Sequence, residues 1–148
     1  MDIARLIYVS TAPETPGEPE LQEILKVSRL KNDAAGVTGL LFSVGPHFMQ
    51  LLEGEEDRVN ETFERIRHDD RHHDVMIIHT ETDTQRLFPD WSMGFAVQDL
   101  PSLIPASKWV GARSAKLEAL LPKDLDPHVR MLFLSFRGAR DIHLATAV

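Results

Sequence analysis

The sequence predicts an α+β fold: a ferredoxin-like two-layer sandwich, with a mixed five-stranded sheet, two helices on one face and a C-terminal helical pair. Short apolar runs bounded by turn residues alternate with longer amphipathic segments in the order strand, helix, strand, strand, helix, strand, strand (βαββαββ). Right-handed βαβ crossovers then bring both helices to the same side of the sheet. The hydrophobic content of 43% and charged content of 26% are ordinary for a single globular domain with a sizeable core.

Each element follows from local spacing and from the residues that interrupt it. Prolines and a glycine after Thr11 end the first strand, and Gly45-Pro46 separates two apolar runs as a hairpin turn does. Residues 33–36 read as a turn after the first helix. The expected strands cover residues 3–10, 37–44, 47–53, 75–80 and 93–97, and the expected helices cover residues 18–32 and 55–68.

The C-terminal third predicts two more helices. One is expected over residues 106–121, and the other begins at the cap Asp126-Pro127, runs to about Phe136 and stops at Gly138. We expect this pair to cover the sheet face that the first two helices leave open, or to mediate self-association. The chain therefore divides into a domain over residues 1–98 and a helical extension over residues 99–148.

Charge and composition exclude several classes of function. The absence of cysteine excludes disulfides, thiolate ligands and cysteinyl photoadducts. A formal net charge of −7 argues against nucleic-acid binding, which needs Lys and Arg to neutralise phosphates. We expect no membrane segment, because no apolar run approaches the length of about 20 residues that spans a bilayer. The N-terminus lacks a signal-peptide pattern, which predicts a cytoplasmic protein.

Two polar residues are expected inside the sheet. Tyr8 is the sole tyrosine and lies in the apolar run Leu6-Ile7-Tyr8-Val9-Ser10, and Gln50 is the one strongly polar residue of Phe48-Met49-Gln50-Leu51-Leu52. A buried hydroxyl without a hydrogen bond costs roughly 1–3 kcal/mol, so each side chain needs a partner. The two residues can bond to each other or to the backbone, or a bound ligand can serve both.

Five strings then occur together in a characteristic order. This combination closely resembles the BLUF family of blue-light sensors, which bind a flavin, and the resemblance covers about residues 2–98. The strings are Leu6-Ile7-Tyr8-Val9-Ser10, Asn32, Gly36-Val37-Thr38-Gly39-Leu40-Leu41, Phe48-Met49-Gln50-Leu51-Leu52-Glu53-Gly54 and Phe88-Pro89-Asp90-Trp91-Ser92-Met93-Gly94-Phe95.

The resemblance implies a flavin site between the two helices and the sheet. Ile24 and Ile66 match the apolar residues that sandwich the flavin ring, and Asn32 matches the amide that bonds to its pyrimidine edge. Lys31 stands where other members often carry His or Asn that contacts the ribityl chain. The full set of implied flavin-binding residues is Tyr8, Ile24, Ser28, Lys31, Asn32, Gln50, Ile66, Asp69, Arg71 and His72. The implied cofactor is FAD, with FMN possible.

The resemblance also implies a photochemical switch without a covalent bond. Tyr8 gives an electron and then a proton after blue light excites the flavin, and Gln50 is left with different hydrogen bonds. Trp91 and Met93 match the residues that relay the change toward the C-terminal region. On this interpretation the protein is not an enzyme, forms a homo-oligomer and signals to a separate effector protein.

Other classes of protein remain as alternatives. A cofactor-free ferredoxin-like interaction module fits the fold equally well. An acylphosphatase-type hydrolase needs a glycine-rich phosphate cradle, which we do not find. The polar stretch after the second helix can also be a solvated turn, or an adventitious metal site made by His68, His72 and His73, although we predict no functional metal.

Overall fold

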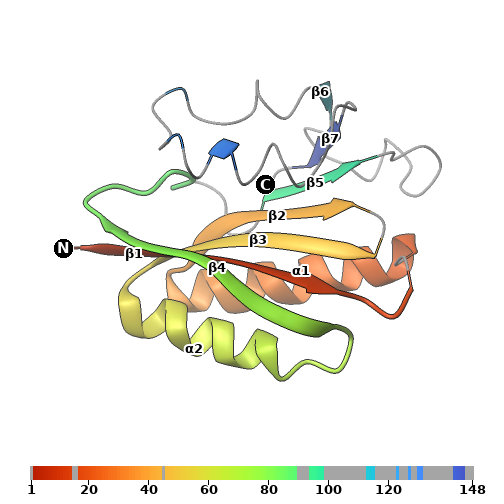
Figure 1. Cartoon of the computed structure of the whole chain (residues 1–148), viewed down its shortest axis with the longest axis horizontal. Helices are drawn as coiled ribbons and strands as arrows, with labels where there is room; N and C mark the ends of the chain where they lie inside the picture. The colour runs from red at the N-terminus through yellow and green to blue at the C-terminus, as the bar shows by residue number, and fades with distance from the viewer. Residues whose placement is uncertain are drawn as a thin grey trace.

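The architecture is a sheet covered on one face by two helices, as Figure 1 shows. The computed structural model describes residues 2–14, 17–44, 46–89, 94–98, 113–115, 123, 127, 130–131 and 142–145. Within these residues the strands are β1 (Ile3–Thr11), β2 (Thr38–Val44), β3 (His47–Gly54), β4 (His73–Asp83), β5 (Gly94–Gln98), β6 (Arg113–Ala115) and β7 (Ile142–Ala145). The helices are α1 (Glu18–Ala35) and α2 (Glu56–Arg67).

The first four strands form an antiparallel sheet with β1 and β3 at its centre. The strand order is β4-β1-β3-β2-β5-β7-β6, and β5 runs parallel to β2. The α+β class and the two helices on one face are confirmed. The register places Tyr8 directly opposite Gln50, so two polar side chains from distant parts of the sequence become neighbours.

Helix boundaries follow from their terminal residues. Gly36 adopts the left-handed conformation at φ 69° and ends α1, which is the usual role of a glycine just past a helix. Helix α2 carries acidic residues in its first turn and arginines in its last, which complements the helix dipole. Neither helix is long and apolar enough to cross a membrane, which is a finding about the described residues alone.

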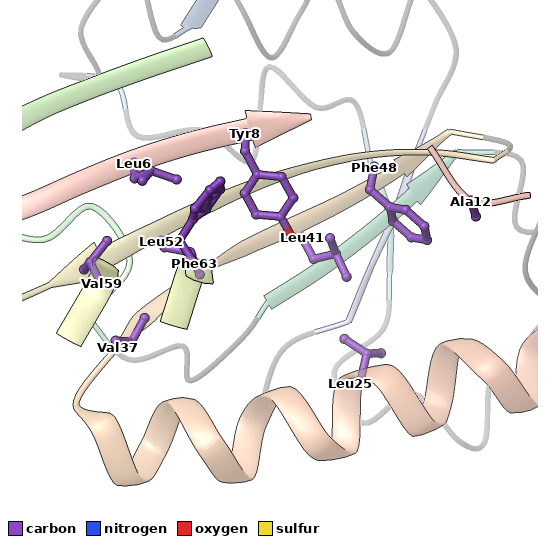
Figure 2. Close-up of a cluster of buried hydrophobic side chains, with 10 residues drawn as sticks. All are labelled: Leu6, Tyr8, Ala12, Leu25, Val37, Leu41, Phe48, Leu52, Val59 and Phe63. Carbon is purple, nitrogen blue, oxygen red and sulfur yellow. The ribbon is translucent and has the colours of Figure 1, made fainter. Parts of the chain in front are cut away.

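Both faces of the central strands are buried. The face toward the helices carries the cluster drawn in Figure 2, whose sheet residues include Leu6, Tyr8 and Leu52. Leu25 from α1 and Phe63 from α2 close this cluster from the helical layer. The opposite face buries Ile7, Leu40, Phe42, Met49 and Leu51 almost completely. The alternation of side chains along a strand therefore places the polar pair Tyr8 and Gln50 on the helix-facing side of the sheet and these five apolar side chains on the other side.

Three predictions about the elements were wrong. Residues 33–35 continue α1 and do not form a turn, and the described residues hold seven strands where five were expected. The helix predicted over residues 106–121 is interrupted by β6, because the backbone of Arg113–Ala115 pairs antiparallel with β7. In the second predicted C-terminal helix, Pro127, Arg130 and Met131 have helical backbone. The remaining residues of both predicted helices lie outside the described part of the chain.

Candidate functional site

The site begins with a hydrogen bond between the two central strands. Tyr8 Oη donates to Gln50 Oε1, and both side chains are only 3% exposed. The phenol has a single proton, so this bond fixes the orientation of the Gln50 amide and directs its NH2 group to a different acceptor. A side chain that can donate at one end and accept at the other is thus held against a phenol inside the core.

The surroundings of Tyr8 keep its phenol neutral. Burial raises the pKa of Tyr8 well above its ordinary value, and the negative charge of Asp69 raises the pKa further. The ring meets Phe63 edge to face at 5.4 Å between centroids, and the His72 ring lies 6.4 Å away. Tyr8 is therefore a protonated hydrogen-bond donor across the ordinary pH range, with aromatic neighbours that fix the orientation of its ring.

A cavity opens beside this pair, between the sheet and the two helices. Its volume is about 80 Å³, which is less than the roughly 300–1,000 Å³ of typical small-molecule sites, so a larger ligand must displace part of its walls. Ile24 from α1 and Ile66 from α2 contribute apolar walls. The lining residues are Tyr8, Ser10, Ile24, Ser28, Leu41, Phe48, Gln50, Ile66, Asp69, Arg71 and His72.

His72 joins the cavity wall to the end of α2. Its Nε2 lies 2.6 Å from the carbonyl oxygen of Ile66, and because a carbonyl can only accept, Nε2 carries a proton. Its Nδ1 lies 2.9 Å from the hydroxyl of Ser10, which donates to Nδ1 when the ring is neutral. Ser10 on β1 therefore orients His72, and both residues face the cavity.

Asp69 and Arg71 form an ion pair at the cavity. Arg71 Nε lies 3.0 and 3.1 Å from the two Asp69 oxygens, and Nη2 lies 2.6 Å from Oδ2. The backbone N–H of Arg71 also donates to Asp69 at 2.9 Å. These bonds to Arg71 lower the pKa of the Asp69 carboxyl below its usual value. The pair places one fixed negative and one fixed positive charge near the buried phenol.

The structure brings most of the predicted flavin-binding residues to this cavity. Two of the ten, Lys31 and Asn32, do not line it. Lys31 is exposed on α1, whereas Asn32 is 1% exposed near the end of that helix, and its backbone carbonyl accepts from Val37 at 2.9 Å. Trp91 and Met93, the predicted relay residues, lie outside the described residues.

Sequence reasoning missed three residues of the cavity wall. Ser10, Leu41 and Phe48 line the cavity but are absent from the predicted set. The signal for Ser10 was available, because alternation along β1 puts it on the same face as Tyr8. Phe48 likewise shares a face with Gln50 on β3. Leu41 carries no such signal, since only the register Leu41↔Gln50 between β2 and β3 brings it there.

The histidines near the end of α2 do not converge on one point. His68 Nδ1 lies 2.7 Å from the backbone oxygen of Glu64, and His73 Nδ1 lies 2.9 Å from Asp74. His72 has the separate partners described above. Among the described residues, no group of three or more His, Cys, Asp or Glu side chains is placed to hold a metal ion.

The residues that line the cavity match the chemistry of a flavin ring. A flavin needs two apolar surfaces for its flat faces and hydrogen-bonding groups for its carbonyl and ring nitrogens. Ile24 and Ile66 supply apolar surfaces from opposite helices, and Gln50 supplies an amide. A second hollow shares Ile24, Phe48 and Arg71 with the cavity and so adjoins it.

Comparisons with known proteins point the same way. A family model described as "BLUF: Sensors of blue-light using FAD" matches residues 3–94. The photoactivated adenylate cyclase subunit beta of Euglena gracilis is 30% identical over 125 residues, which are 81% of this chain. The blue light- and temperature-regulated antirepressor BluF of Escherichia coli (strain K12) is 32% identical over 74 residues, half of this chain and 18% of that protein.

Solved structures give the same likeness in three dimensions. The dark-state structure of the BLUF protein BlrB has a TM-score of 0.61 at 33% identity and covers 71% of this chain and 80% of that one. A bacterial light-regulated adenylyl cyclase has a TM-score of 0.62 at 36% identity and covers 64% of this chain and 28% of that one. The chain spans about 15% of the length of the Euglena gracilis cyclase subunit that it matches.

Proposed function

The chain belongs to the BLUF family of blue-light sensors that use a flavin, and we propose that Tyr8 and Gln50 form the switch of a photoreceptor. The observation that carries this proposal is the buried hydrogen bond from Tyr8 to Gln50 beside a cavity between the sheet and the two helices. When bound, a flavin supplies the absorption of blue light and a strongly oxidising excited state. The protein supplies the electron and proton donor, Tyr8, and the group that records the event, Gln50.

Gln50 can record the event because its two ends differ. In the present arrangement Oε1 accepts from the phenol and the NH2 group points elsewhere. Rotation of the amide, or its tautomerisation, exchanges donor and acceptor, so that Tyr8 Oη faces a different group and the second partner of Gln50 also changes. Burial favours two discrete arrangements over a continuum, because an amide left without partners inside a core is costly.

The cofactor is proposed to be FAD, and FMN presents the same ring to the same cavity. Ile24 and Ile66 would hold the flat faces of that ring, and Asn32 its pyrimidine edge. Ser28, Lys31, Asp69, Arg71 and His72 would contact the polar edge or the ribityl chain. The position of eight of the ten proposed residues around one cavity supports this assignment.

The output is proposed to pass to another protein. The family's domain is itself a sensor, and the cyclase relatives are far longer than the part that this chain matches. We propose that this chain is not itself an enzyme, and that residues 1–98 sense light while residues 99–148 pass the signal to a separate effector. Trp91 and Met93 are the proposed relay between them. A cytoplasmic homo-oligomer without nucleic-acid or membrane partners is proposed from the acidic charge and the sequence pattern.

Illumination of the purified protein tests the proposal directly. We expect a yellow protein whose flavin absorption shifts reversibly to the red in blue light and returns in the dark. Tyr8→Phe should keep the flavin, because the ring packs similarly, but should lose the shift, because the phenolic donor is gone. Phe63→Leu is the matched control, since it changes an aromatic neighbour of Tyr8 and leaves the phenol in place. A normal photocycle in Tyr8→Phe would refute the role of Tyr8.

A further inference from the structure

A fully buried carboxylate lies three residues beyond Gln50 on the same strand. Glu53 is 0% exposed, and its Oε2 accepts from Arg5 Nε at 3.1 Å and from the backbone N–H of Leu87 at 3.0 Å. Its Oε1 accepts from the backbone N–H of Phe88 at 2.6 Å. A buried ion is costly unless its partners satisfy it, so these three donors allow Glu53 to remain inside.

Arg5 lies on β1, the strand that carries Tyr8, and it binds the same stretch of chain that Glu53 binds. It lies three residues before Tyr8, is 2% exposed and donates from Nη2 to the carbonyl oxygen of Gln85 at 3.0 Å. Its Nη1 also pairs with Glu81 and, at 3.3 Å, with Asp83 at the end of β4. The register sets Arg5 opposite Glu53 just as it sets Tyr8 opposite Gln50.

The segment over residues 85–88 is therefore held by the two strands that carry Tyr8 and Gln50. Arg86 adds bonds to the carbonyl oxygen of Gly36 at 2.8 Å and to the Thr38 hydroxyl at 3.0 Å, which link the segment to the start of β2. Phe88 is itself buried. In sequence the segment leads from β4 to β5.

We propose that Glu53 is a positioning residue that couples the hydrogen-bond state of Gln50 to residues 85–88, with Arg5 as its partner. The proposal rests on the proposed function and adds a route out of the site. Gln50 and Glu53 lie three positions apart, so their side chains point to opposite faces of β3 and one backbone shift of the strand moves both. Glu53 passes that shift on because its two oxygens hold two successive backbone N–H groups.

The carboxylate is chemically required for this contact. Both oxygens of Glu53 face donors, and an amide has only one oxygen. Glu53→Gln would turn an NH2 group toward either Phe88 N–H or the pair formed by Arg5 and Leu87 N–H. Arg5 would also lose its buried counter-charge. The substitution therefore removes hydrogen bonds that Glu53 makes to residues 85–88 and to Arg5, but it changes no residue that lines the cavity.

Hydrogen exchange of the flavin-loaded full chain tests the coupling. Amide exchange at Leu87 and Phe88 would be compared in the dark and under continuous blue light. We expect light to change their protection several-fold in the wild type. In Glu53→Gln we expect the flavin red shift to persist while this light-minus-dark difference disappears. Glu61→Gln, an exposed carboxylate on α2 paired with Arg58, is the matched control and should retain both responses.

Each outcome separates the two proposals. A wild type that shows the red shift but no light-dependent exchange at Leu87 and Phe88 refutes the coupling alone, and absence of the red shift refutes the photoreceptor. A difference that survives in Glu53→Gln also refutes the coupling, because a merely structural residue would alter dark and light exchange equally. If Glu53→Gln does not fold, Arg5→Lys provides the test. A lysine keeps the positive charge but cannot bond to both Glu53 and Gln85, so we expect a smaller light-minus-dark difference in amide exchange at Leu87 and Phe88.

Discussion

Tyr8 owes its role to the register of one strand pair. Its Cα partner on β3 is Gln50, and a slip of one residue would turn every side chain of β1 to the other face. Leu6 and Leu52 are buried on the same face as the pair, so a slip of β1 would turn Leu6 out of the cluster that it forms with Leu52 and the helices. The hydrophobic pattern that stabilises the sheet therefore also sets the contact between donor and switch.

Gln50→Leu should separate flavin binding from switching. The leucine keeps much of the side-chain volume and removes both the donor and the acceptor, so we expect the flavin to remain bound and its light-induced infrared change at C4=O to vanish. Tyr8 Oη would lose its partner in the core, which should cost about 1–3 kcal/mol in the free energy of unfolding. The double variant with Tyr8→Phe should recover part of this loss. Persistence of the infrared signal would show that another group is the switch.

The ionisation of Tyr8 predicts the behaviour of the protein in alkali. Burial raises the folded-state pKa above the ordinary value of 10.0, so above that pH the unfolded chain gives up a proton that the folded chain keeps. The stabilisation is fully present below pH 10 and declines as the pH rises toward the folded-state pKa. We expect the unfolding midpoint to fall above pH 10 more steeply than in Tyr8→Phe. Because Tyr8 is the only tyrosine, tyrosinate absorption reports it alone, and ionisation near pH 10 in the folded state would contradict the prediction.

At the scale of elements, the local spacing of apolar residues predicted most helices and strands of the domain. It did not predict strands that form by pairing with segments far away in the sequence. Strands β1 to β3 and both helices carry clear apolar periodicity, so the sequence located them. The extra turn of α1 was missed because Asp33 suggested a turn, although the alanines that follow favour helix as far as Gly36. Strands β6 and β7 are three and four residues long and exist through their pairing with each other and with β5, which no local pattern records.

The candidate site was likewise predictable in its local features and unpredictable in its long-range contacts. Alternation predicted that Tyr8 and Gln50 are buried and need partners, and the resemblance to a known family supplied the residues that we predict to contact the flavin ring. The hydrogen bonds that Leu87 and Phe88 donate to Glu53 could not be predicted from local pattern, because 34 and 35 residues separate the partners. Arg5 and Glu53 are 48 residues apart and meet only through the register of β1 against β3. Charged residues at the ends of apolar strands give no local sign that they will be buried.

The β2–β3 pair depends on one glycine. A Cβ atom at Gly39 would lie 1.8 Å from the backbone oxygen of Leu51, so Gly39→Ala must displace the strand. We expect a loss of about 3 kcal/mol or more in the free energy of unfolding, measured from urea midpoints. Gly17→Ala is the control, because its nearest contact is 3.8 Å away and only the helix cap changes, at a cost of about 1 kcal/mol or less. Equal stabilities of the two variants would contradict the close approach of β2 to β3.

At the scale of the whole molecule, the cavity and the far end of the sheet are built from separate parts of the chain. Every lining residue of the cavity falls between Tyr8 and His72, whereas β6 and β7 extend the sheet beyond β5. Binding of the cofactor is therefore expected to need only the first part of the chain. The edge of β5, by contrast, is paired by β7, which lies more than 40 residues further along the chain.

Truncation after Gln98 should expose this separation. The shortened protein keeps the cavity, so we expect it to bind flavin and to show the red shift. It loses β7, the antiparallel partner of β5, and an unpaired strand edge is a template for association with other chains. We therefore expect the truncated protein to aggregate at micromolar concentrations, and we expect the full chain to form a defined homo-oligomer at the same concentrations. Light scattering coupled to size exclusion measures both. A truncated protein as monodisperse as the full chain would show that β7 does not protect this edge. A full chain that is monomeric in both dark and light would refute the homo-oligomer and leave a heterologous effector as the sole recipient of the signal.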